Sequence, residues 1–318
     1  MRASCAISVF ATLLTACQAS DDAAATSDSD AGVADGTSLT RALTLPLVAE
    51  KKLTKLLPTK QVDHYEASGV VASGGMLYVA FDNLTNIAAI DTSLGKGTLG
   101  PGEAVDSQYE AITASTDGRF FAMVEATTAT AEVAEFDAAT AFVEQRATNV
   151  TFPHANKGFE GAAWLQVGDA EYLLALCENN NCKDDDTAPG KGRAQLLLRE
   201  GDVWVSMRTL KLPESAAFLD YSDIALQSNG DGTYAAAVVS HKSSALWLGT
   251  LSTSSWAFTA SNTFYVFPRT KDGAVQYCSV EGVTFLGPNV IAVASDKSDG
   301  NEPCTDEEES IHIFQMPQ

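Results

Sequence analysis

The 318-residue sequence has few positive charges and few histidines. It contains 20 lysines and arginines against 41 aspartates and glutamates, together with only four histidines, and its formal net charge is −21. A chain with this balance repels the phosphates of DNA and RNA, which argues against a nucleic-acid partner. The acid excess is compatible with cation binding, although acidic residues that only aid solubility explain most of it.

Long apolar runs and common catalytic signatures are also missing. Beyond the N-terminal segment, no stretch is long and apolar enough to cross a membrane as a helix. No G-x-S-x-G elbow, H-E-x-x-H helix, phosphate-binding loop or dinucleotide fingerprint occurs, which removes the commonest hydrolase, zinc-protease and nucleotide-binding interpretations. Apart from a weak pattern around Leu47 to Leu57, no segment has a helical period. These absences favour an all-β protein.

The N-terminus indicates export. Arg2 precedes a short apolar run that ends in Leu14-Thr15-Ala16-Cys17. A charged start, a brief apolar core and small residues before a cleavage point predict a signal peptide over residues 1–16. The cysteine resembles the lipidated cysteine of bacterial lipoproteins, and Gln18 after it then implies the outer membrane. The alternative is an ordinary signal peptide with a coincidental cysteine. We expect Cys17 to carry a lipid that anchors the protein without spanning the membrane.

The rest of the chain divides into a tether and one domain. Residues 17–43 are rich in Ala, Ser, Thr, Asp and Gly and have no aromatic residue, which predicts a flexible tether. Residues 44–318 are enough to bury a sizeable core. Their four cysteines predict two disulfides in an oxidising compartment, and three pairings are possible. We favour Cys177–Cys182 and Cys278–Cys304.

Five copies of one pattern fill this domain. Each copy has a polar or acidic start, an apolar run, a turn rich in Gly, Asn or Asp, and two further β-rich runs. The copies begin at Ala67-Ser68-Gly69-Val70, Tyr109-Glu110-Ala111-Ile112, Phe159-Glu160-Gly161-Ala162, Tyr221-Ser222-Asp223-Ile224 and Val280-Glu281-Gly282-Val283. Clear fourth strands are visible only over Val203 to Leu212 and Thr263 to Phe267. Such repeats predict a β-propeller of five or six blades. Because the last copy has only three strands, we expect a strand within residues 43–57 to close the ring.

Two sets of side chains should meet at one mouth of the central channel. The first strand of each copy runs across the ring and the second runs back, so the start of one and the end of the other share a face. The first set is Ser68, Glu110, Glu160, Asp223 and Glu281, and the second set is Asp82, Glu125, Glu178, His241 and Asp296. So many carboxylates repel one another unless they are compensated.

Calcium is the simplest compensation, because it prefers hard oxygen ligands and the sequence has few histidines. We expect Glu110, Glu160, Asp223 and Glu281 to hold Ca²⁺, with Glu160, His241 and Asp296 as catalytic candidates. Two alternatives remain open. Water and Lys157, Lys242 and Lys297 provide the compensation in the first, and the Glu-Gly motif only shapes the start of each blade in the second.

Other candidate residues are weaker. The loop from Glu178 to Lys191 contains Asp184-Asp185-Asp186, but it lacks the spacing of an EF-hand, and acidic runs are usually solvated surface. His64, His154 and His312 are scattered, which favours structural or surface roles over ligation.

The motifs also resemble, in order, those of the esterase-like phytase family of exported bacterial proteins. The matching segments are Ser68-Gly69, Tyr109-Glu110, Asn156-Lys157-Gly158-Phe159-Glu160-Gly161, Tyr221-Ser222-Asp223, Val280-Glu281-Gly282 and Ser295-Asp296. The resemblance covers most of residues 65–315 and implies a propeller and hydrolysis of phosphate esters. Ala111 replaces the usual glycine, and Lys297 stands where Asn often follows Ser-Asp. The resemblance therefore supports the architecture more strongly than the substrate.

Two functions follow as hypotheses. In the first, calcium at the mouth polarises a phosphate ester or a lactone, and His241 or a carboxylate with a raised pKa acts as general base. Phytate itself would need several calcium ions, because the chain has few basic residues. In the second, the propeller is not catalytic and binds a glycan, a peptide or an envelope protein, with the membrane contacted only through the lipid anchor.

Overall fold

The computed structural model describes residues 42–57, 62–105, 107–125, 130–153, 158–179, 182, 190–297, 304 and 307–317, with backbone alone at 261–263. All of them belong to the unit formed by residues 39–318. The predicted signal peptide, Cys17 and nearly all of the tether lie outside the described residues, as do His154, Lys157 and the Asp184-Asp185-Asp186 run. Within the described part, no helix has the length and apolar character needed to cross a membrane.

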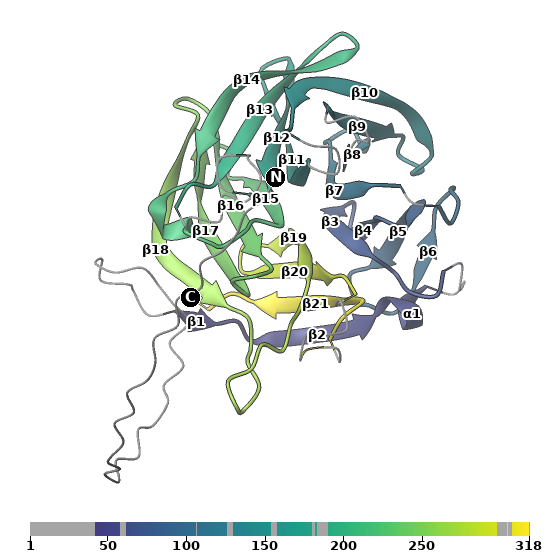
Figure 1. Cartoon of the computed structure of the whole chain (residues 1–318), viewed down its shortest axis with the longest axis vertical. Coiled ribbons are helices and arrows are strands. Elements are labelled where there is room, and N and C mark those ends of the chain that lie inside the picture. The colour runs from purple at the N-terminus through teal and green to yellow at the C-terminus, as the bar shows by residue number, and fades with distance from the viewer. Residues whose placement is uncertain are drawn as a thin grey trace, which may run out of the picture. The chain divides into compact units, whose positions relative to one another are not determined.

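Mainly antiparallel strands follow one another round a ring in units of four (Figure 1). The first unit contains β3 (Ala67–Ser73), β4 (Met76–Phe81), β5 (Leu84–Asp91) and β6 (Gly97–Leu99), and the second contains β7 (Tyr109–Ala114), β8 (Phe120–Val124), β9 (Thr130–Phe136) and β10 (Phe142–Thr151). The third unit contains β11 (Phe159–Val167), β12 (Ala170–Cys177), β13 (Arg193–Glu200) and β14 (Val203–Lys211). The fourth unit contains β15 (Asp223–Ser228), β16 (Thr233–Ser240), β17 (Ala245–Ser252) and β18 (Ala257–Val266). A parallel pair at Thr148 and Trp204 joins the second and third units into one eight-stranded sheet. Strands β6 and β10 supply the fourth strands that the sequence shows poorly.

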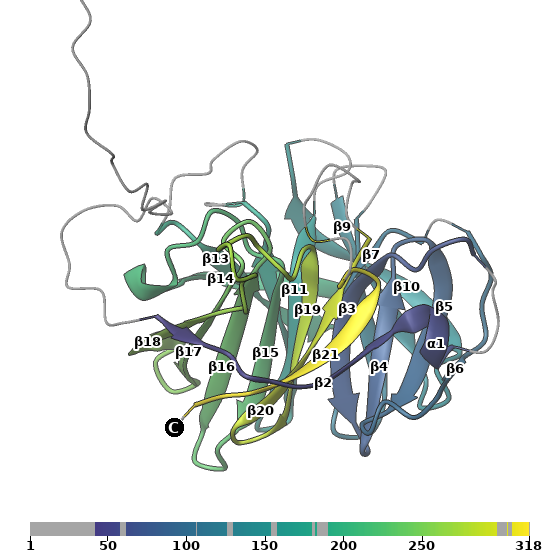
Figure 2. The same ribbon diagram turned by 90° about the horizontal axis from the view of Figure 1, so that it is seen from below.

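The fifth unit is completed by the N-terminal part of the domain. It contains β19 (Val280–Gly287), β20 (Val290–Ser295) and β21 (Ser310–Gln315), and its fourth strand is β2 (Leu47–Lys52), which pairs antiparallel with β21. Figure 2 shows β2 running alongside the yellow β21. A two-residue strand, β1 (Leu43–Thr44), adds in parallel to β18. The expected closing strand is therefore confirmed. A single turn of helix, α1 (Leu53–Leu56), replaces its last part.

The apolar core lies between neighbouring units. Buried side chains form five clusters, and each cluster joins two adjacent units, including the last unit and the first. The first strands, β3, β7, β11, β15 and β19, alone line a channel cavity of about 230 Å³. Blades that pack face to face around a central channel, with the ring closed by strands from both ends of the domain, define a β-propeller.

Turns and disulfides agree with the sequence predictions. Gly75, Gly118, Gly168 and Gly230 have positive φ values in the predicted hairpin turns, where other residues are strained. Both favoured cysteine pairs are present, with Cα atoms 5.1 Å apart for Cys177–Cys182 and 5.5 Å apart for Cys278–Cys304. The first disulfide closes the loop after β12, and the second ties the segment before β19 to the segment before β21.

Candidate site at the acidic mouth of the channel

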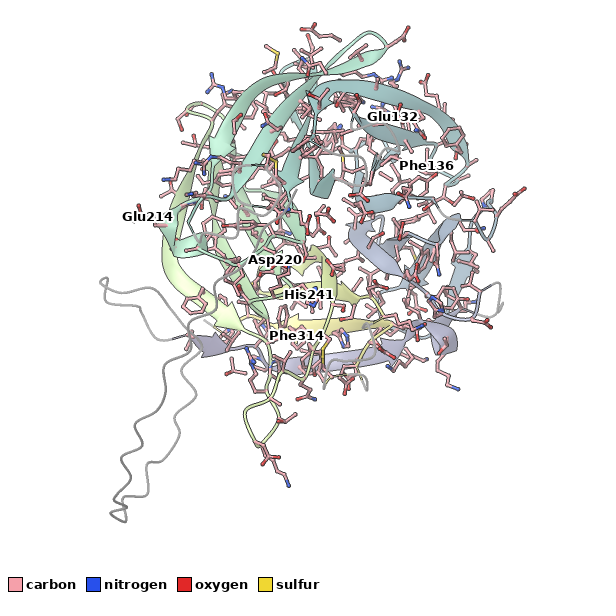
Figure 3. The ribbon with its side chains drawn as sticks, in the orientation of Figure 1. Glu132, Phe136, Glu214, Asp220, His241 and Phe314 are labelled. Carbon is pink, nitrogen blue, oxygen red and sulfur yellow. A yellow bond between two sulfur atoms is a disulfide. The ribbon has the colours of Figure 1, made fainter. Side chains whose placement is uncertain are left out.

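A cavity of about 200 Å³ lies where the first strands begin and the second strands end. Its lining residues are Ser68, Asp82, Glu110, Glu160, Glu178, Asp220, Tyr221, Ser222, His241, Lys242, Glu281 and Asp296. Eight of the ten residues predicted for the mouth are among them. In Figure 3, Asp220 and His241 are labelled near the centre of the ring. We call this cavity the acidic mouth.

Beta-bulges aim the first set of side chains at the acidic mouth. In four of the units, the strand pairing slips by one residue at the start of the first strand, and the extra residue is Ser68, Glu110, Glu160 or Glu281. A residue displaced from the ladder in this way is free to turn its side chain away from the usual alternation. The bulges explain why these four side chains reach the cavity.

The glycine after the bulged residue has a separate, structural role. A Cβ atom at Gly161 would lie 2.8 Å from the Asp223 Cα atom on the next unit, and one at Gly282 would lie 2.7 Å from the Val70 backbone nitrogen. Only glycine lets adjacent first strands approach this closely. In the Glu-Gly motif, the glycine therefore serves packing and the glutamate faces the cavity.

The fourth unit differs, and the prediction that Asp223 faces the acidic mouth is wrong. Its first two strands pair without a bulge, and Asp223 does not line the cavity. The fully buried Asp223 carboxylate instead accepts hydrogen bonds from the backbone N–H groups of Ile224 at 2.7 Å and Val283 at 2.8 Å. Burial raises the pKa of Asp223 well above its usual value. Asp223 thus ties the fourth unit to the fifth.

Asp220, Tyr221 and Ser222 take places at the mouth that the sequence did not predict, and Lys242, expected there as a compensating charge, also lines the cavity. Asp220 is buried and accepts hydrogen bonds from the Ser240 hydroxyl and the Lys242 backbone, and its Oδ2 lies 4.0 Å from the Lys242 ammonium. Burial raises the pKa of the Asp220 carboxyl. Its position just before the Tyr-Ser-Asp motif was the available signal. Without the bulge of the other units, that motif reaches the cavity through residues before Asp223.

The second set of predicted residues splits between lining and support. Asp82, Glu178, His241 and Asp296 line the cavity, while Glu125 does not. The negative charge of Glu125 nevertheless contributes to raising the pKa of both Glu110 and Glu160. Glu178 directly follows Cys177, whose disulfide to Cys182 stabilises the end of β12 beside the acidic mouth.

One histidine is oriented by a neighbouring carboxylate. The His241 Nδ1 atom lies 3.2 Å from Glu281 Oε1, and both side chains are about one-quarter exposed. The two residues come from different units, since His241 follows β16 and Glu281 lies in β19. The Ser222 hydroxyl accepts a hydrogen bond from the His241 backbone N–H at 3.2 Å. A carboxylate on Nδ1 fixes the orientation of the imidazole ring.

Burial and mutual repulsion raise the pKa of several carboxyls here. Burial raises the pKa of Glu110 well above its usual value, and the charges of Asp82 and Glu125 add to this. Burial likewise raises the pKa of Glu160, with further effects of Glu110 and Glu178. The pKa of Asp296 rises to about 8, first through burial and then through Glu281. At the acidic mouth, burial and the charges of neighbouring carboxylates therefore act together to raise these pKa values.

The arrangement offers oxygen ligands but no closed metal cage. Seven lining residues are carboxylic acids, and they provide the hard oxygen atoms that Ca²⁺ prefers. Among the described residues, however, the mouth does not bring three ligand atoms within 4.8 Å of one another. A cation held here would need water ligands or side-chain rotation, both of which the flexible coordination of Ca²⁺ tolerates.

Comparison with known proteins supports the architecture. No protein-family model and no curated protein sequence matches this chain. Solved structures do resemble it. Myxococcus xanthus glutaminyl cyclase has a TM-score of 0.52 at 9% identity, covering 87% of this chain and 100% of that one. Xylan β-1,4-xylosidase of Bacillus halodurans C-125 has a TM-score of 0.51 at 10% identity, covering 83% and 54%.

A third similar structure is a GH43 β-xylosidase/α-arabinofuranosidase from a compost microbial metagenome, with a TM-score of 0.50 at 11% identity, covering 86% of this chain and 95% of that one. Identities this low show a shared fold and nothing about the reaction. The chain thus shares its fold with these structures.

Proposed function

We propose that this chain is an exported lipoprotein whose propeller binds Ca²⁺ at the acidic mouth and hydrolyses an ester, with phosphate esters as the first substrate class. The observation that carries the proposal is the His241–Glu281 pair, 3.2 Å apart, at a cavity lined by seven carboxylic acids. This combines an oriented base with a set of oxygen ligands in one enclosed place.

Glu110, Glu160 and Glu281 are the proposed calcium ligands. Each sits on a β-bulge, and each lines the cavity. Asp223 is left out of the ligand set because its oxygens accept backbone hydrogen bonds. Bound calcium would polarise the ester oxygen and offset the charge of an anionic substrate.

The proton transfers fall to groups of the chain itself. Glu281 orients His241, which takes a proton from the attacking water. Asp296, whose pKa lies near 8, carries a proton at neutral pH and donates it to the leaving oxygen. Lys242, half exposed at the rim, contributes the positive charge that an anionic substrate requires. The resemblance of the motifs to those of esterase-like phytases supports the hydrolytic class.

Lipid anchoring is proposed from Leu14-Thr15-Ala16-Cys17 and the Gln18 that follows. The chain in its native compartment should partition into detergent, and Cys17→Ser should move it to the aqueous phase. Unchanged partitioning of the variant would refute the anchor.

The metal and the chemistry are tested together on the full chain. Melting temperature is measured in EDTA and in Ca²⁺, and phosphate release is measured with a panel of phosphate esters. We expect Ca²⁺ to raise the melting temperature of the wild type but not of Glu160→Gln or Glu281→Gln. His241→Ala should keep the calcium effect and lose turnover by about 100-fold or more. Glu200→Gln, an exposed carboxylate at the end of β13, is the matched control and should behave as the wild type.

The outcomes separate the hypotheses. A calcium effect without turnover of any ester would favour the non-catalytic propeller that binds a glycan, a peptide or an envelope protein. If calcium had no effect on the melting temperature, the acidic motifs would only shape the start of each blade. The hydrolase proposal would then lose its basis.

A further inference from the structure

A second cluster of potential metal ligands lies at the seam where the ring closes. Glu50 on β2, Glu307 before β21 and His312 on β21 each place a ligand atom within 4.8 Å of the others. Glu50 lies near the N-terminal end of the domain's sequence, whereas Glu307 and His312 lie near its C-terminal end. The cluster is separate from the acidic mouth, since none of its members lines that cavity.

His312 is held in a fixed orientation. Its side chain is fully buried, and the Tyr277 ring packs against it edge-on at 4.9 Å. The Ser295 hydroxyl lies 3.1 Å from the His312 Nε2 atom, while Nδ1 lies 3.3 Å from the Glu50 carboxylate. Metal-binding histidines are typically oriented by such a partner on the nitrogen that does not bind the metal.

The two carboxyls of the cluster need a proton or a cation between them. A carboxylate oxygen of Glu50 and one of Glu307 lie within 4.8 Å of each other and of a ring nitrogen of His312. The nearby Lys52 ammonium donates a hydrogen bond to the Glu308 carbonyl at 2.6 Å.

We propose that Glu50, Glu307 and His312 form a Zn²⁺ site that clips the N-terminal strand β2 to the C-terminal strand β21. One imidazole nitrogen and two carboxylate oxygens are ligand types that zinc accepts, with water in the fourth position. An imidazole is a poor ligand for Ca²⁺, so this site and the acidic mouth select different cations. The partly exposed Glu50 side chain leaves the site accessible to metal from solution.

The proposed zinc site would stabilise the strand pairing that closes the ring. The strand pair β2–β21 is what completes the last unit, and the ladder between them is only six residues long on each side. A metal that binds both strands stabilises the closed ring over any state in which β2 has detached. Zinc should therefore slow opening of the seam specifically.

The test is zinc binding to the full chain after EDTA treatment and dialysis, followed by calorimetry and by hydrogen exchange of the amides of Leu47–Lys52. We expect one Zn²⁺ ion to bind per chain at Glu50, Glu307 and His312. Compared with the metal-free chain, the zinc-bound chain should have a higher melting temperature and slower hydrogen exchange in β2. Glu50→Gln and Glu307→Gln should each weaken binding by about tenfold or more, since even contacts beyond the direct ligands have effects of that size. Both replaced side chains are partly exposed, so folding should survive.

Glu160→Gln at the acidic mouth and the exposed Glu200→Gln serve as controls and should keep this zinc effect. Loss of zinc binding in both seam variants, with the controls unchanged, supports the clip. No binding by the wild type, or equal binding by Glu307→Gln, overturns it. Either result is independent of calcium and of hydrolysis.

Discussion

Two acidic regions of this propeller differ in how the negative charge of their buried carboxylates is compensated. Between the second and third units, Glu135 lies 3.0 Å from Arg146 and 3.1 Å from Arg199, and Glu171 lies 2.6 Å from Arg119. We call this group the arginine network. The lining of the acidic mouth, as far as the structure describes it, contains seven carboxyls, His241 and the half-exposed Lys242, and no arginine.

The difference indicates which region is structural and which is functional. Carboxylates that each face an arginine join two units and lose little by being ionised. Buried carboxyls that lie close together with no arginine among them favour keeping their protons or binding a cation, because ionising them all costs stability. Proteins accept that cost mainly where a ligand or a reaction requires it. The contrast therefore directs the functional proposal to the mouth.

The largest effect is expected from breaking the arginine network. Glu135→Ala leaves two partly buried guanidinium groups without their shared carboxylate. Because Arg146 and Arg199 retain other acidic neighbours, we expect a loss of about 2–3 kcal/mol in the free energy of unfolding. Urea denaturation at neutral pH measures it, with Glu200→Ala as the exposed control. A loss no larger than that of the control would show that the network is dispensable.

The next effect concerns the geometry that supports the mouth. Gly161→Ala places a methyl group 2.8 Å from the backbone of Asp223 and Ile224, so the first strands of two units must separate. We expect a loss of about 2 kcal/mol in unfolding free energy, together with weaker calcium binding through displacement of Glu160. Gly287→Ala, where an added Cβ meets no atom within 4 Å, is the matched control. Equal behaviour of the two variants would contradict the close approach.

The smallest expected effect is a pH-dependent difference in melting temperature caused by a substitution at the acidic mouth. The pKa values of Glu110, Glu160 and Asp296 are raised in the folded state, so folding favours the protonated form of each carboxyl. The contribution of these groups to the free energy of unfolding is therefore fully present at pH values below their unfolded pKa values. It is lost as the pH rises through the folded values, near 8 for Asp296. In EDTA, Glu160→Gln should therefore melt about 3 °C above the wild type at pH 8 and equally at pH 4.

Saturating calcium should reverse that order at pH 8, because only the wild type gains the bound cation. Melting curves at the two pH values, with and without calcium, give the comparison. A variant that melts below the wild type in EDTA at pH 8 would mean that Glu160 is compensated by groups of the chain itself.

Much of the architecture was predictable because it rests on local chemistry. Each repeat carries its own turn glycines, its apolar alternation and its polar start, so Glu110, Glu160 and Glu281 could be placed at one mouth. The missing fourth strand of the last copy indicated closure by the N-terminal segment, and the structure confirms it. The cysteine pairs followed from short spacing and from their place in the repeat.

Other features depend on register and on contacts between units. Asp223 shares the motif position of Glu160, yet its unit lacks the bulge, and its carboxylate accepts hydrogen bonds from backbone N–H groups of its own strand and of a neighbouring strand. Asp220 reaches the cavity for the same reason. The seam cluster joins residues far apart in sequence, and no local pattern connects Glu50 with His312.

The sequence by itself determined the repeat, the turns and the side chains available at the start of each blade, since these depend on residues close together in the chain. The tertiary structure alone decided which of those side chains face the cavity and which are neutralised. A one-residue slip in strand pairing reverses the direction of a side chain, and the free energy of a buried charge depends on whichever distant groups the closed ring places beside it.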